Sequence, residues 1–87
     1  MAAPTKVASA ITSTVLVAPS TRRRVFMENS DANRLHVLLG SGTASTTDYS
    51  FSLAQYENCE IVDYSGEIKG IWAADGAGFA LITEIGT

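Results

Sequence analysis

Apolar residues in this chain recur at every second position in short runs, and clusters of Gly, Ser, Asn and Asp interrupt these runs. A period of two places successive side chains on opposite faces of a β-strand, whereas an α-helix has a period of 3.6 residues. Helix-period patterning is nearly absent from the chain. The pattern therefore predicts an all-β domain, either a small antiparallel β-sandwich or a jelly-roll-like barrel.

The runs predict about seven strands. The expected ranges are 7–17, 22–29, 34–39, 48–53, 56–62, 67–74 and 79–85. In the first of them Val7, Ile11, Val15 and Val17 should share one face. No linker interrupts the series, so residues 1–87 are expected to form a single β domain. Within it, residues 1–18 are a candidate N-terminal arm that could be exchanged with a neighbouring copy.

Turn chemistry separates the expected strands. Residues 29–33, "NSDAN", favour a turn because Asn and Asp tolerate left-handed dihedrals and bond to their own backbone. Residues 75–78, "DGAG", give the strongest hairpin signal, because glycine takes positive φ at low cost. We expect the last two strands to pair across this hairpin and to pack Trp72 and Phe79 in the core.

The size and composition limit how the domain can be stabilised. A chain of 87 residues buries only about 60 to 65 per cent of its unfolded surface, so its core is thin. Cys59 is the only cysteine, which excludes an intrachain disulfide. We expect it to be a small core residue. Charged residues make up only 17% of the chain, which suggests that part of the surface is covered. Oligomerisation is the expected further source of stability.

Membrane insertion and secretion are not expected. The longest apolar runs are a few residues, far shorter than the 18 or more that a membrane span requires. The first residues alternate small, polar and branched side chains and form no continuous apolar segment of a signal peptide.

The residues offer little catalytic chemistry. His36 is the only histidine, and it falls on an outward strand position between Leu35 and Val37, so we expect a partly exposed surface or interface residue rather than a base. The acidic residues that cluster in sequence are read as solvated charges on an edge strand. They are Glu57, Glu60, Asp63 and Glu67. The glycine-rich segments lack the lysine of a phosphate-binding loop. We expect no enzyme, no metal and no cofactor.

Three consecutive arginines, Arg22, Arg23 and Arg24, stand out in a chain whose net charge is -3. A basic cluster suggests nucleic acid. However, an acidic chain is repelled by phosphate, and strand geometry would turn Arg22 and Arg24 one way and Arg23 the other. Pairing with carboxylates, within an oligomer or on a protein partner, is therefore preferred to nucleic-acid binding. The full set of interface candidates is Arg22, Arg23, Arg24, Arg34, His36 and Trp72.

The order of several short motifs resembles a group of small virion proteins of tailed bacteriophages, the capsid decoration or cement proteins. The matching segments are "NS" at 29–30, "LHVLLG" at 35–40, "AS" at 44–45 with Tyr49, "YSGEIKGIWA" at 64–73 and "TE" at 83–84. The resemblance spans the chain from about Val15 onward. The chain departs from such sequences at "AQYENCEI", where many of them have glycines and a second tyrosine, so the loop there should have its own shape.

The resemblance implies a structural role in a phage particle. Such proteins typically form homotrimers on the outer capsid surface, contact the major capsid protein and stabilise the shell. It would place this chain on the virion after synthesis in the host cytoplasm, with no nucleic-acid or membrane partner. A component of the tail or a head fibre remains an alternative. So does an adhesion module of the virion that binds carbohydrate through Trp72, Tyr49 or Tyr64.

Overall fold

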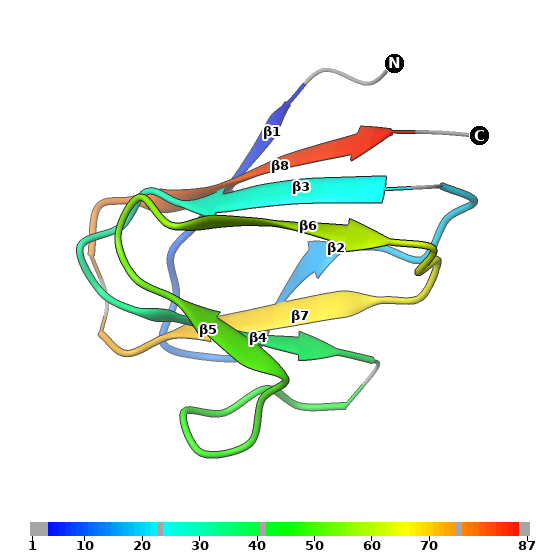
Figure 1. Ribbon diagram of the computed structural model, residues 1–87. Coiled ribbons are helices and arrows are strands. Elements are labelled where there is room, and N and C mark those ends of the chain that lie inside the picture. Colours follow the sequence, from blue (N-terminus) through cyan, green and yellow to red (C-terminus); the bar gives the residue numbers. More distant parts are fainter. Residues whose placement is uncertain (1–3, 23, 41, 75, 86–87) are drawn as a thin grey trace.

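The computed structural model describes residues 4–22, 24–40, 42–74 and 76–85, and the strands in them form two antiparallel sheets that face each other (Figure 1). This confirms the prediction of an all-β fold, with eight strands where about seven were expected. The strands are β1 (Thr5–Ala8), β2 (Thr14–Val17), β3 (Arg24–Asn29), β4 (Leu35–Leu39), β5 (Phe51–Leu53), β6 (Asn58–Val62), β7 (Ile68–Trp72) and β8 (Phe79–Ile85).

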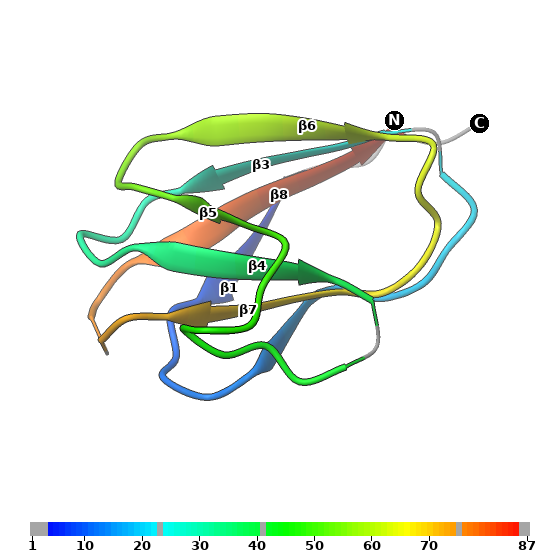
Figure 2. The same ribbon diagram turned by 60° about the horizontal axis from the view of Figure 1, so that its bottom comes forward.

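The strands pair in a nested order, the first with the last and so on inward along the chain. Sheet A has the order β1-β8-β3-β6, and sheet B has the order β2-β7-β4-β5. Strand β1 pairs with β8, β2 with β7, β3 with β6 and β4 with β5, as in a long hairpin that is wrapped into two layers. This is the arrangement of a jelly roll, and Figure 2 shows the two layers with β6 at one edge of sheet A.

The range 7–17, expected as one strand, is divided between the two sheets. Strand β1 lies in sheet A and β2 in sheet B, and the connection between them is held where Trp72 N–H donates to the Ala10 carbonyl at 3.0 Å. The expected common face is therefore wrong, since Ile11 is 58% and Val15 is 44% exposed. The register shifts between Val15 and Val17, a β-bulge or similar irregularity, and both Leu16 and Val17 are buried.

The "DGAG" segment does not close a hairpin, because β7 belongs to sheet B and β8 to sheet A. Its position 75 lies outside the described residues. The glycines serve a close approach instead: Gly78 N–H donates to Asp31 Oδ2 at 3.0 Å. A Cβ atom on Gly78 would lie 2.5 Å from the Cα atom of Asp31, which only glycine avoids.

The core lies between the inner faces of the two sheets. Its residues are Leu16, Val17, Val25, Met27, Leu35, Val37, Leu53, Ile68, Trp72, Ala80 and Ile82. The prediction for Trp72 is confirmed, but the one for Phe79 is wrong. Strand β8 turns Ala80 and Ile82 inward, so Phe79 lies half-buried on the outside, where Lys6 Nζ is 4.8 Å from the centre of its ring.

Side chains on β3 and β6 alternate between two faces, as the period of two in the sequence predicts. Val25 and Met27 on β3 are buried, and Phe26 between them is exposed. Strand β6 stands at one edge of sheet A, as the acidic residues around it predicted, and Glu60 on this strand is exposed. Cys59, expected as a core residue, is partly buried and packs against the core.

Candidate protein-binding surface

The outer face of sheet A carries several apolar side chains among charged and polar ones. The register sets Phe26 of β3 between Thr83 of β8 and Glu60 of β6, and Glu28 between Leu81 and Asn58. With alternate side chains pointing outward, the face consists of Lys6, Ala8, Arg24, Phe26, Glu28, Asn58, Glu60, Val62, Phe79, Leu81, Thr83 and Ile85. We call this set the outer face of sheet A. Phe26 is 40% and Val62 is 54% exposed on it.

A shallow groove crosses this face and encloses about 210 Å³. It is lined by Phe26, Met27, Glu28, Asn58, Leu81 and Thr83. The Phe26 and Leu81 side chains supply apolar walls, and Glu28 is the only ionisable residue in the lining. Next to the groove, Arg24 Nη1 lies 3.3 Å from Glu60 Oε2, while no ion pair within the described part of the chain involves Glu28. The groove therefore joins apolar surface to one uncompensated negative charge.

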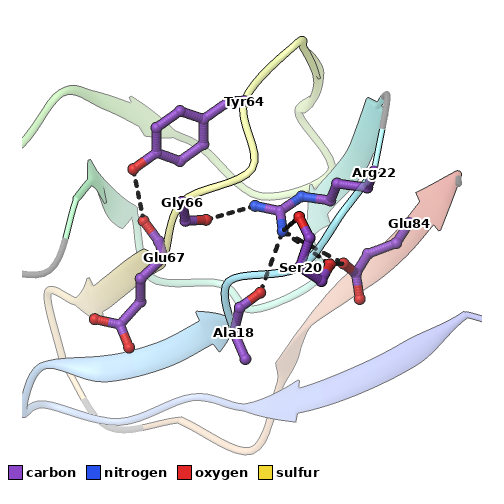
Figure 3. Close-up of polar contacts among 7 residues, drawn as sticks. All are labelled: Ala18, Ser20, Arg22, Tyr64, Gly66, Glu67 and Glu84. Atoms are coloured by element: carbon purple, nitrogen blue, oxygen red, sulfur yellow. Dashed lines mark hydrogen bonds and ion pairs between the residues drawn. The ribbon is translucent and has the colours of Figure 1, made fainter. Parts of the chain in front are cut away.

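Arg22, the first sequence candidate, is a structural residue of this chain. Its side chain is 1% exposed. Nη1 donates to the Ala18 carbonyl at 3.2 Å and Nη2 to the Gly66 carbonyl at 2.6 Å. Nη1 also lies 3.6 Å from Glu84 Oε1 (Figure 3). Arg22 thus joins the β2–β3 connection, the β6–β7 turn and strand β8, and it is enclosed by its own chain rather than displayed to a partner.

The other arginines have different surroundings. Arg24, at the start of β3, has a side chain that is 49% exposed, so it does not share the environment of Arg22 as the strand pattern predicted. Arg23 lies outside the described residues. Arg34 is exposed, and its Nη1 donates to Ser52 Oγ at 2.9 Å. The two described members of the triplet do pair with carboxylates, Glu84 and Glu60, but within this chain.

His36 points away from the core, as expected, but it is only 8% exposed. The Tyr49 ring packs edge-on against it, with 4.6 Å between the ring centroids. The segment between β4 and β5 therefore covers the outer side of β4 here. Trp72 is 1% exposed, and its indole Nε1–H donates to Asn29 Oδ1 at 3.0 Å. Both rings are buried within the single chain, and their assignment as interface residues stays a prediction.

A buried polar cluster next to Trp72 is satisfied from within the chain. The Asp31 carboxylate accepts bonds from Asn33 N–H at 2.7 Å, from Asn33 Nδ2 at 2.9 Å and from Gly78 N–H. Burial alone would raise the pKa of Asp31, but hydrogen bonds from Asn33, Ser9 and Gly78 together outweigh it, so this pKa lies below its ordinary value. These bonds fix the loop geometry and use the carboxylate oxygens that a ligand would need.

Neither a metal cluster nor an ionisable thiol stands out. In the ranges that the structure describes, no group of three or more His, Cys, Asp or Glu side chains is arranged to hold a metal ion. Burial raises the pKa of the Cys59 thiol, which makes the thiolate scarcer. The same ranges contain no helix that is long and apolar enough to cross a membrane.

The comparisons with known proteins add no assignment. Protein-family models, curated proteins and solved structures gave no match to this chain.

The sequence reasoning missed the outer face of sheet A. One signal was present, because Phe26 alternates with Val25 and Met27 and so had to point away from the core. The other was the apolar set Phe79 and Leu81, which alternates with Ala80 and Ile82. Both faces of β8 carry apolar residues, and the pattern alone does not tell which face is inside.

Proposed function

We propose that this chain is a bacteriophage structural protein, a capsid decoration or cement protein that binds the outer capsid surface as an oligomer and stabilises the shell. The observation that carries the proposal is the outer face of sheet A, where Phe26 and Val62 are exposed and Leu81 lines the groove with Phe26. Large exposed apolar side chains that gather on one face of a small domain favour a site of protein contact. The partners in this proposal are the major capsid protein and further copies of the chain, in a homotrimer.

Several residues that carry the resemblance to phage decoration proteins make structural contacts in the fold. In the motif "YSGEIKGIWA", Tyr64 O–H donates to the Glu67 carbonyl at 2.9 Å and Gly66 accepts from Arg22. Trp72 of the same motif bonds to Asn29 of "NS". The matched positions therefore build the framework of the fold. They support a shared architecture, and the jelly roll is an arrangement found in viral capsid and lectin domains alike.

The carbohydrate-binding alternative is less well supported. It needs aromatic rings exposed together in one groove, whereas Trp72 is buried and Tyr64 is half-buried with its hydroxyl bonded to the chain. Among the three rings considered, Tyr49 alone is exposed, and it packs on His36. Trp72, Tyr49 and Tyr64 therefore do not form a group of exposed rings on which a sugar could stack.

Three measurements test the proposal. Light scattering of the purified chain should give the mass of an oligomer, three copies in the homotrimer case. Co-sedimentation with empty capsids of the phage that encodes the chain should carry it into the pellet, and electron microscopy of labelled protein should place it on the shell. A monomer that stays in the supernatant would contradict the proposal, and label on the tail or fibres would favour the other virion role.

A further inference from the structure

We infer that the groove on the outer face of sheet A is the docking site for one segment of the capsid shell protein, which inserts an apolar side chain and pairs an adjacent Lys or Arg with Glu28. This inference rests on the proposed function for the identity of the partner. It adds the chemistry of the contact and the residues of this chain that make it.

The groove has the shape of a pocket for one side chain. Phe26 and Leu81 stand on neighbouring strands, β3 and β8, and leave the groove open to solvent between them. A volume of about 210 Å³ admits a side chain of the size of Leu, Met or Phe rather than a larger ligand. Removing such a side chain from water contributes about 1.5–3 kcal/mol of transfer free energy, which suits an anchor residue.

Glu28 selects the charge of the incoming segment. Glu28 lies on β3, opposite Leu81 of β8 on one side and Asn58 of β6 on the other. Both of its cross-strand neighbours are therefore uncharged. The nearest acidic residue on the face, Glu60, is already paired with Arg24. A cation brought in by the partner would therefore compensate the one charge of the groove, and an acidic segment would be repelled.

Away from the outer face of sheet A, a second copy of this chain offers no such segment among the described residues. Its large exposed apolar side chains away from the outer face of sheet A are Ile11, Val15, Tyr49 and Tyr56. None of them has Lys or Arg as a sequence neighbour. These surroundings favour a different polypeptide as the occupant of the groove.

The first test compares two charge reversals in the capsid co-sedimentation assay. Glu28→Lys in the groove should weaken binding at least about tenfold, because attraction to the partner's cation becomes repulsion. Asp48→Lys changes the net charge by the same amount in the β4–β5 connection and should leave binding unchanged. Equal binding of both variants, with folds intact by circular dichroism, would overturn the inference while the proposed function stands.

The second test needs no capsid. Isotope-labelled protein is titrated with the peptide acetyl-Gly-Leu-Arg-Gly-amide, and with acetyl-Gly-Leu-Glu-Gly-amide as the control, while amide chemical shifts are followed by NMR. The Arg peptide should shift the amides of Phe26, Glu28 and Leu81 with a Kd on the order of millimolar, and the Glu peptide should bind at least about tenfold more weakly. The inference would be overturned if the Arg peptide caused no chemical shift changes, or if both peptides caused equal changes. A response to the Arg peptide without capsid binding would instead contradict the proposed function alone.

Discussion

Trp72 and Asn29 are joined by a buried hydrogen bond, from indole Nε1–H to side-chain Oδ1 at 3.0 Å, that connects sheet B to sheet A. Asn29 is fully used: Oδ1 also accepts from Asp31 N–H, and Nδ2 donates to the carbonyls of Asn33 and Leu53. A buried amide with all its partners satisfied specifies one arrangement of the two layers, because any shift leaves polar groups unpaired in the core. Asn29, which the sequence pattern assigned to a turn, therefore links the two sheets.

Replacing Asn29 with Ala should lower the free energy of unfolding by about 3 kcal/mol or more, because several buried polar groups lose their partner at once. Trp72→Phe should cost less, since Asn29 Oδ1 keeps its bond from Asp31. Urea unfolding followed by circular dichroism measures both. The exposed Asn58→Ala is the control, with an expected loss below about 0.5 kcal/mol. Similar losses of unfolding free energy for Asn29→Ala and Asn58→Ala would contradict the role of Asn29 in linking the two sheets.

Arg22 and Arg24 should differ sharply when each is replaced by Gln. Arg22→Gln removes donors to the Ala18 and Gly66 carbonyls and the partner of Glu84, so we expect a loss of about 2–4 kcal/mol in the free energy of unfolding. Arg24→Gln removes one exposed ion pair and should cost less than about 1 kcal/mol.

Thermal unfolding of the two variants at the same protein concentration separates them. Light scattering on each folded variant then reports the oligomeric state, so a loss of stability is not mistaken for a loss of assembly. If Arg24→Gln proved the more destabilising of the two, the structural assignment of Arg22 would be wrong.

Gly78 should not tolerate a side chain. The Cβ atom of Gly78→Ala would lie 2.5 Å from Asp31 Cα and 2.8 Å from the Ser30 carbonyl oxygen, and backbone atoms cannot rotate away as a side chain can. We expect a loss of about 1–3 kcal/mol in urea unfolding. Gly42→Ala is the matched control, because its Cβ would meet only Leu38 Cδ2 at 3.5 Å. Comparable stability of the two variants would show that the loops have room to separate.

The sequence pattern predicted strands and faces well where burial is one-sided. On β3 the alternation of Val25, Phe26 and Met27 identified the strand and divided its side chains correctly between two faces. It failed on β8, where Phe79 and Leu81 are apolar although they face outward. Period-two patterns report only that two faces differ, and an outer face that carries apolar residues looks like a core face.

Local sequence patterns do not predict which strands pair with each other. The "DGAG" segment correctly marks a place where the chain turns, but whether the turn returns within one sheet or crosses to the other depends on the pairing of β1 with β8. Arg22 shows the same limit. A guanidinium is expected at the surface, and its burial becomes possible only because the fold brings the carbonyls of Ala18 and Gly66 together.

Asp31 should make the stability of the domain depend on pH. Its pKa in the folded chain lies below the ordinary value of 3.8, because hydrogen bonds to the carboxylate outweigh the effect of burial. Folding therefore favours the charged form, and the resulting stability is present above the unfolded pKa and is lost as the pH falls through the folded pKa. In Asp31→Asn the amide Nδ2 faces the Gly78 N–H, a donor against a donor, which should cost about 1–3 kcal/mol at neutral pH. Urea unfolding of both proteins at about pH 7 and about pH 2.5 measures the difference, which should shrink at the lower pH. A difference that stayed constant, or grew, on acidification would mean that the Asp31 carboxylate is not stabilised by the folded loop.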